Sequence, residues 1–167
     1  MSATREQLFA KLAELGITVT THEHSPVFTV EEAKKVHDKI PGGHCKNLFC
    51  KDEKGELWLI VALEDAIINL KTAPMKIGSK RLTFGKPDLL MEILGVEPGS
   101  VTPFGLINDR HARTNVILDQ RMMQEQLLNF HPLQNTATTS LQSRDLLTFI
   151  TACGHRPRVV ALSEPLP

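Results

Sequence analysis

The sequence predicts one compact domain of the α+β (mixed α/β) class over residues 1–167. Three observations predict it. Segments with helical spacing are interleaved with short β-branched or apolar runs, giving about six or seven strands and five helices. The 167 residues are 41% hydrophobic and 23% charged, as in folded domains, and a chain of this length buries roughly 70% of its unfolded surface. No internal repeat, Gly/Ser-rich linker or shift in composition divides the chain.

The N-terminal elements follow from periodicity and capping residues. Leucines at helical spacing predict a helix over Thr4–Leu15, which Gly16 ends. β-branched residues predict a strand over Ile17–Thr21. The pattern at Thr29–Glu32 is that of a capping box, so a second helix is expected over Val30–His37.

A β-hairpin is predicted next, after Pro41–Gly43, which interrupt the regular secondary structure. Its strands are His44–Lys51 and Glu56–Leu63, and the polar residues Asp52–Gly55 form the turn. The second strand is almost wholly apolar, which predicts burial on both faces.

The remaining elements are shorter. Residues 69–94 suggest short helices around an extended Arg81–Phe84, and Glu97–Pro103 is a loop with room for one helical turn. The C-terminal third begins with a predicted strand at Asn115–Leu118, a short helix at Met122–Leu128 and two short strands within Phe130–Leu141. A helix from Ser143 to about Cys153, a strand at Arg158–Leu162 and a frayed tail at 163–167 are predicted to follow.

Charge and composition exclude several classes of protein. The 19 basic and 19 acidic residues balance, so indiscriminate polyanion binding is not expected, although a local basic patch is compatible with this balance. Aromatic residues are only 5%, which argues against a broad stacking platform for single strands. No apolar run approaches the ~20 residues of a membrane span. Three cysteines without a CxxC pair, and the lack of a signal peptide, predict reduced thiols in a cytoplasmic protein.

Standard catalytic and metal motifs are absent from the sequence. It contains no phosphate-binding P-loop, GxGxxG, GxSxG, HExxH or EF-hand pattern. His22 and His24 would share one face of a strand, but no further ligands stand at suitable spacing, so neither a metal nor a cofactor is expected. Cys45 and Cys50 fall on opposite faces of one strand and do not suggest a redox couple.

Three features remain, and each has a bland and a functional interpretation. Lys46 is either a solvent-facing strand residue or a cation that holds an anionic or reacting group. Gly99–Pro103 is either a plain turn or a loop that aims backbone N–H groups at a developing oxyanion. His131, with its backbone kept extended by Pro132, is either an interior histidine or the wall of a pocket.

Taken in order along the chain, these segments resemble the prolyl-tRNA editing family. That family includes the editing domain of bacterial prolyl-tRNA synthetases and the free-standing YbaK-type and PrdX-type deacylases. The resemblance covers about residues 5–162. The matching stretches are Gly42–Phe49, Leu57–Val61 and Gly99–Leu106, while Arg81–Phe84 and Asn129–Thr139 are most similar to the PrdX-type branch, which clears alanine from proline tRNA.

The resemblance implies a fold, an activity and a site. It implies a largely antiparallel, curved sheet surrounded by helices, and hydrolysis of the ester between a wrong amino acid and the 3′-terminal adenosine. Lys46 matches the essential lysine of the family, and Gly99, Ser100, Val101, Thr102 and Pro103 match its GxxxP loop. Asn47, Phe130 and His131 are assigned to the aminoacyl pocket.

The expected substrate is Ala-tRNA(Pro), bound through its acceptor end. Cysteine or serine on the same tRNA, and a catalytically silent module that binds tRNA or a synthetase, are the alternatives. Transient contact with prolyl-tRNA synthetase or an elongation factor is a further expectation, and contact with a membrane is not expected. The cations expected to contact phosphates are Lys76, Lys80, Arg81, Lys86, Arg110 and Arg113.

Overall fold

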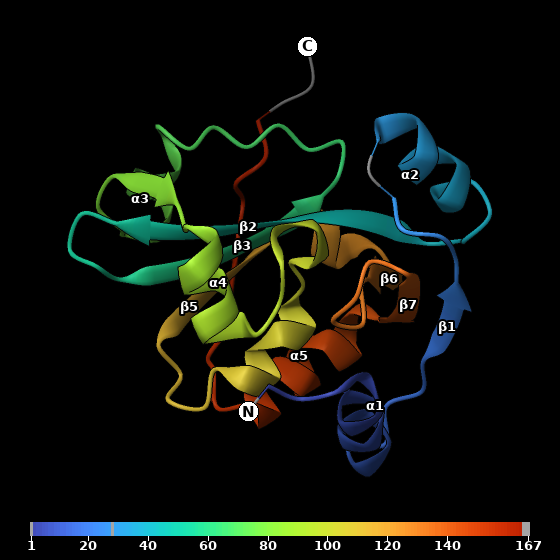
Figure 1. Cartoon of the computed structure of the whole chain (residues 1–167). Coiled ribbons are helices and arrows are strands. Elements are labelled where there is room, and N and C mark those ends of the chain that lie inside the picture. The colour runs from blue at the N-terminus through green and yellow to red at the C-terminus, as the bar shows by residue number, and fades with distance from the viewer. Residues whose placement is uncertain (1, 28, 165–167) are drawn as a thin grey trace.

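The computed structural model describes residues 2–27 and 29–164, which form one sheet with helices on both of its faces (Figure 1). The helices are α1 (Arg5–Glu14), α2 (Val30–His37), α3 (Ala73–Ile77), α4 (Pro87–Leu94) and α5 (Ser143–Ala152), with 3₁₀ turns η1 (Pro98–Ser100), η2 (Pro103–Asn108) and η3 (Met122–Gln124). The strands are β1 (Thr20–Glu23), β2 (Gly43–Asp52), β3 (Leu57–Leu63), β4 (Leu82–Phe84), β5 (Thr114–Asp119), β6 (Leu127–Phe130), β7 (Ala137–Gln142) and β8 (Arg158–Val160).

The eight strands form a mixed sheet in the order β1-β7-β6-β2-β3-β5-β8, with β4 added beside β2. Four pairings are antiparallel (β1·β7, β2·β3, β2·β4, β6·β7) and three are parallel (β2·β6, β3·β5, β5·β8). The α+β class predicted from the sequence is confirmed. The parallel pairings arise where crossovers, and not hairpins, connect the strands.

Two apolar clusters lie on opposite faces of this sheet. The larger one packs α1, α4, η2 and α5 against one face, through residues such as Leu8, Leu94, Phe104 and Phe149. The smaller cluster packs α3 and Leu162 against the other face. All seven residues of β3 are buried because both faces of this strand are covered, as its apolar sequence predicts.

Most predicted elements are confirmed within one or two residues, and four predictions are wrong. The first strand is Thr20–Glu23, and Ile17 is instead a buried core residue. Residues 122–128 are not a helix: a 3₁₀ turn ends at Gln124, and β6 begins at Leu127. Of the two strands expected within Phe130–Leu141, only β7 lies in that described stretch, because β6 ends at Phe130. The tail is anchored as far as residue 164, because Ser163 N–H donates to Asp119 and Glu164 N–H to the Ile67 carbonyl, at 3.1 and 2.8 Å. Residues 165–167 lie outside the described part.

A buried contact between a carboxylate and a histidine fastens the segment after η2. The Asp109 carboxylate accepts hydrogen bonds from the N–H groups of Arg113 (3.1 Å) and Thr114 (2.8 Å), and from His155 Nε2–H (2.9 Å). Both Asp109 and His155 are only 3% exposed. Burial acts to raise the pKa of Asp109, but these hydrogen bonds outweigh it and lower the pKa to about 2. The ionised Asp109 carboxylate therefore links η2, β5 and the end of α5 through its hydrogen bonds.

None of the helices in residues 2–27 and 29–164 combines the length and the apolar character needed to cross a membrane.

Candidate functional site

The central strand β2 carries two of the predicted site residues, Lys46 and Asn47, and directs them to opposite faces of the sheet. Successive strand side chains alternate. Asn47 shares its face with Cys45 and Phe49, which belong to the larger apolar cluster. Lys46 shares its face with Leu48 and Cys50, which belong to the smaller one. The two side chains therefore lie on different sides of one strand.

Asn47 has an unsatisfied polar atom. Its side-chain oxygen Oδ1 is buried and has no hydrogen-bond partner among the described residues. A buried acceptor left unpaired costs roughly 1–3 kcal/mol, so native proteins keep few of them. This oxygen is free to accept a hydrogen bond from a ligand.

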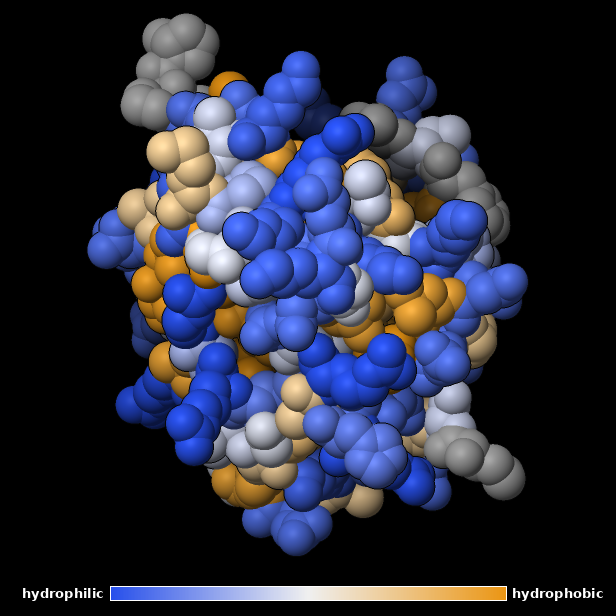
Figure 2. Space-filling model, turned by 90° about the vertical axis from the view of Figure 1, so that its left-hand side faces the viewer, coloured by the Kyte–Doolittle hydropathy of each residue, from blue (hydrophilic) through white to orange (hydrophobic). Residues whose placement is uncertain are grey.

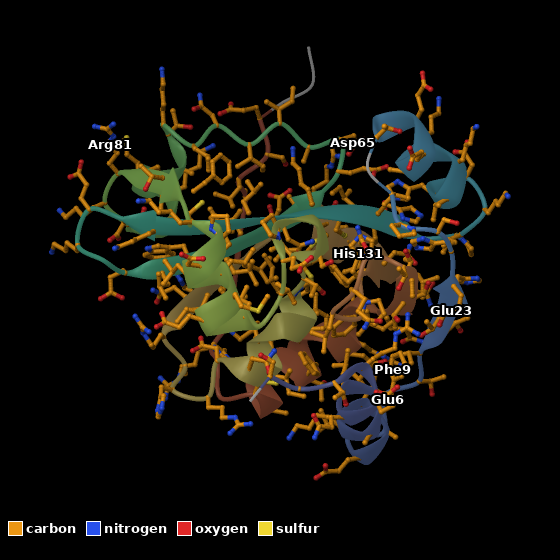
Figure 3. The ribbon with its side chains drawn as sticks, in the orientation of Figure 1. Glu6, Phe9, Glu23, Asp65, Arg81 and His131 are labelled. Atoms are coloured by element: carbon orange, nitrogen blue, oxygen red, sulfur yellow. The ribbon has the colours of Figure 1, made fainter. Side chains whose placement is uncertain are left out.

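Lys46 is held at the end of the hairpin. Its Nζ donates a hydrogen bond to the carbonyl of Ala66, in the loop that follows β3. Two side-chain contacts fix the same loop: Glu64 contacts His37 Nδ1 at 2.7 Å, and Asp65 forms an ion pair with Arg121. Asp65 is labelled in Figure 3 above the sheet. The ammonium is thus placed by an anchored loop.

The GxxxP loop, Gly99–Pro103, presents backbone donors. Ser100 N–H donates to Glu97 O at 2.8 Å, and Pro103 has no N–H. In the described part of the chain, the N–H groups of Val101 and Thr102 have no acceptor. Two successive free N–H groups are the donors that an oxyanion needs.

Close packing behind the loop fixes its position. Phe104 is fully buried and lies edge-on to Phe130 and Phe149, with ring centroids 6.0 and 5.4 Å apart. A Cβ on Gly105 would lie 2.9 Å from the carbonyl oxygen of Leu94, so only glycine fits there. Phe130, assigned to the aminoacyl pocket, is itself only 3% exposed and supports the loop from the core.

His131 follows β6 and has a defined tautomer. Its Nδ1–H donates to the Ala137 carbonyl at 2.9 Å, because a carbonyl can only accept. Burial lowers the pKa of His131, so the ring is neutral at pH 7 and Nε2 keeps its lone pair. The His24 ring lies 6.3 Å away between centroids, a contact with His131 that sequence reasoning missed, although the His22-x-His24 pattern drew attention to the residue.

The structure brings the GxxxP loop next to the loop that carries His131. A Cβ built on Gly99 would lie 3.5 Å from the Asn135 side chain, four residues after His131. Asn47, the loop and Phe130 all adjoin the larger cluster. Lys46 lies on the other face, the one covered by the smaller cluster.

Cys45 adjoins Lys46 but is poorly suited to act as a nucleophile. Burial raises the pKa of its thiol far above the ordinary value, so the thiolate is not populated at neutral pH. The Sγ–H group donates to Gly43 O at 3.7 Å. Among the described residues, no three His, Cys, Asp or Glu side chains come together as metal ligands do.

The predicted tRNA-binding cations surround several grooves. Arg81 and Lys86 line a groove of about 580 Å³ beside the exposed Phe84, and Arg81 also borders a second hollow of about 640 Å³. Arg110 and Arg113 line a third, of about 380 Å³. Lys76 Nζ is engaged by the Leu162 carbonyl at 3.3 Å.

Arg81 lies at the left end of the sheet, far from His131 (Figure 3). Figure 2 shows this left-hand side of the molecule, where hydrophilic side chains dominate and smaller apolar patches lie between them. The Lys80 backbone N–H donates to Asp52 Oδ2 at 3.2 Å, which fixes the segment before β4 to the hairpin.

Comparison with known proteins gives consistent results. Residues 24–149 match the family model of the aminoacyl-tRNA editing domain. The chain is 38% identical to the prolyl-tRNA editing protein ProX of Acetoanaerobium sticklandii, over 95% of this chain and 97% of that protein. It is 35% identical to prolyl-tRNA synthetase associated domain-containing protein 1 of Mus musculus, over 95% and 96%. A solved structure of a candidate trans-editing enzyme for prolyl tRNA synthetase shares the fold, with a TM-score of 0.70 and 19% identity over 99% of each chain.

Proposed function

The chain belongs to the aminoacyl-tRNA editing domain family and is an aminoacyl-tRNA deacylase, and on that premise we propose that it removes alanine from mischarged proline tRNA in trans. The name of the Acetoanaerobium relative supports proline tRNA as the substrate, and the match over 97% of that relative supports action as a separate protein. The similarity of Arg81–Phe84 and Asn129–Thr139 to the PrdX-type branch supports alanine.

Asn47 is the observation that carries this proposal. Its unpaired Oδ1 lies on the same face of the sheet as the GxxxP loop. The α-ammonium group of an aminoacyl ester is a donor of the kind that this oxygen lacks. A small site closed by core residues excludes proline by its size. The proline-activating site of a synthetase, in contrast, cannot strongly reject smaller amino acids, because each missing methylene is worth only about 1–3 kcal/mol.

The reaction is hydrolysis of an ester. Water attacks the acyl carbon, and the carbonyl oxygen becomes an oxyanion that the N–H groups of Val101 and Thr102 stabilise. The bond between acyl carbon and ribose oxygen then breaks. The proton lost by the water reaches the leaving ribose oxygen through the neighbouring ribose hydroxyl, and alanine and tRNA(Pro) are released.

Lys46 holds the acceptor end in register from the other face of β2. Its Nζ exchanges the Ala66 carbonyl for a tRNA oxygen when the substrate arrives. His131 and the buried Phe130 form the wall of the pocket. A transient contact with prolyl-tRNA synthetase accords with the names of the vertebrate relatives.

The test is deacylation of Ala-, Cys-, Ser- and Pro-tRNA(Pro) by the purified protein. We expect alanine to be released fastest and proline to be spared, and Lys46→Ala to lower the rate by about 10²-fold, because positioning is lost. Preference for cysteine or serine would reassign the substrate. Failure of the folded protein to act on any of the four would favour a module that only binds tRNA or a synthetase.

A further inference from the structure

The sheet has a narrow junction between the parts that carry different site residues. Strands β1, β6 and β7 form one part, which ends at His131, while β2, β3, β4, β5 and β8 form the other, which carries Lys46 and Asn47. Within residues 2–27 and 29–164, the only strand pairing between the two parts is that of β2 with β6, which has two partner pairs, Gly43 with Leu128 and His44 with Asn129. Neighbouring ladders are longer: β2 and β3 pair at seven positions.

Asn129 spans this junction with its side chain. Its Nδ2 donates to two carbonyls at the start of β2, those of Pro41 at 3.0 Å and Gly43 at 3.2 Å. Its Oδ1 accepts from the hydroxyl of Ser140 on β7. The residue is 3% exposed, so each of these bonds replaces a bond to water that burial removed.

The partners of Asn129 determine its chemistry. Two carbonyls accept and cannot donate, so the group facing them must carry two hydrogens, as an amide nitrogen does. The Ser140 hydroxyl needs an acceptor at the other end. An aspartate would oppose its oxygens to both carbonyls, and an alanine would leave the carbonyls unpaired.

Glycines allow the β2 segment to approach this amide. Gly42 has φ +104°, and a Cβ there would lie 3.0 Å from Asn129 Nδ2 and 3.0 Å from Leu127 O. A Cβ on Gly43 would lie 2.8 Å from the Leu63 side chain. The chain at 41–43 is therefore held directly against β6, three residues before Lys46 and four before Asn47.

We propose that Asn129 is a positioning residue that sets the spacing across this junction, and hence the distance between Asn47 on one side and His131 on the other. It lies two residues before His131 and is in register with His44. It acts through these residues and does not touch the reacting atoms. This proposal rests on the proposed deacylase function for its kinetic consequence, but the structural coupling stands apart from it.

The kinetic test compares Asn129→Ala with Ser140→Ala. The serine variant is the matched control, because it removes one bond of the same buried network but leaves both carbonyl contacts intact. We expect Asn129→Ala to lower kcat on Ala-tRNA(Pro) by about tenfold or more with KM changed less than about threefold, since misplacement of a site by ~1 Å costs up to about 10²-fold. We also expect it to raise deacylation of Pro-tRNA(Pro) relative to alanine.

Ser140→Ala should keep kcat within about threefold of the wild-type value even where its melting temperature falls. Equal loss of kcat in both variants below their melting temperatures, or an unchanged kcat and selectivity in Asn129→Ala, would overturn the proposal. If Asn129→Ala does not fold, Asn129→Ser, which keeps one donor, is compared with Ser140→Ala by the same criteria.

Hydrogen exchange on the free protein separates this inference from the proposed function. Asn129→Ala should speed amide exchange at residues 42–47 and 127–131 and leave β3 and β5 unchanged, whereas Ser140→Ala should not speed exchange at 42–47. Uniform change across the sheet would overturn the positioning role. This measurement needs no tRNA, so a wild-type protein inactive on Ala-tRNA(Pro) would defeat the deacylase proposal alone.

Discussion

At the scale of single residues, replacing Asn47 should lower the deacylase activity without lowering the stability of the fold. Its Oδ1 makes no hydrogen bond, so Asn47→Ala loses no bond from that atom, and the free energy of unfolding should stay within about 1 kcal/mol of the wild-type value. Deacylation of Ala-tRNA(Pro) should nevertheless fall by about tenfold or more in kcat/KM. Urea denaturation and single-turnover kinetics measure the two effects.

Cys45→Ala is the matched control for this variant, because Cys45 lies on the same face of β2 and is a protonated thiol. It should remain active within about twofold. Loss of activity in folded Cys45→Ala would contradict the water-mediated mechanism, and a large loss of stability in Asn47→Ala would show that the amide is structural.

At the scale of elements, the Asp109–His155 pair fastens η2 to β5 and α5. The folded-state pKa of the Asp109 carboxyl is about 2, below the ordinary 3.8. The ionised carboxylate therefore stabilises the fold above pH 4, and this contribution is lost as the pH falls from 3.8 to about 2. This difference in pKa between the folded and unfolded states contributes ~2 kcal/mol to the free energy of unfolding at pH 7.

Asp109→Asn should therefore be less stable than the wild type at pH 7 by ~2 kcal/mol, and its stability should fall less steeply between pH 4 and pH 2. Denaturant midpoints across this range provide the measurement, with the exposed Asp88→Asn as a control for the general effect of removing a carboxylate. Parallel curves for Asp109→Asn and the wild type would refute the linkage.

Local sequence signals predicted many of the helices and strands. Capping residues and periodicity located α1, α2, the β2–β3 hairpin and α5, because these signals are local. Residues 122–128 were predicted as a short helix, yet pairing with β7 draws Leu127–Phe130 into the sheet. That pairing depends on partners distant in the chain, which periodicity does not reveal.

For the site, the resemblance supplied candidate residues but not their faces. Adjacent positions on a strand point to opposite sides, so Lys46 and Asn47 could have been separated from the sequence once the strand was predicted. Asn129 carried no local signal, because its role depends on the carbonyls of Pro41 and Gly43, almost ninety residues earlier in the chain.

At the scale of the whole molecule, a neutral chain must bind tRNA through a local surface. Arg81 lies at the left of the molecule (Figure 3), Lys80 precedes it in the chain, and the segment from Lys76 to Lys86 has no acidic residue. Changing Lys80 and Arg81 to alanine should weaken binding of tRNA(Pro) and reduce the slope of log K against log salt by about 1–2, since each phosphate contact contributes about 0.7–0.9.

The matched control is Arg144→Ala with Arg156→Ala, two exposed cations at the ends of α5. It removes the same charge from another part of the surface and should leave the slope unchanged. Filter binding measured from about 50 to about 200 mM salt distinguishes the two double variants. Equal effects of both pairs would mean that net charge, and not this surface, governs binding.

The alternation of Lys46 and Asn47 along β2 restricts how the gene can change length. Inserting or deleting one residue between Gly43 and Lys46 would exchange the faces of every following side chain in the strand, sending the lysine into the larger core and the amide away from the GxxxP loop. The turn at 53–55 escapes this restriction, because Gly55 has open space around it. Related genes should therefore vary in length at the hairpin turn and remain constant in length through β2.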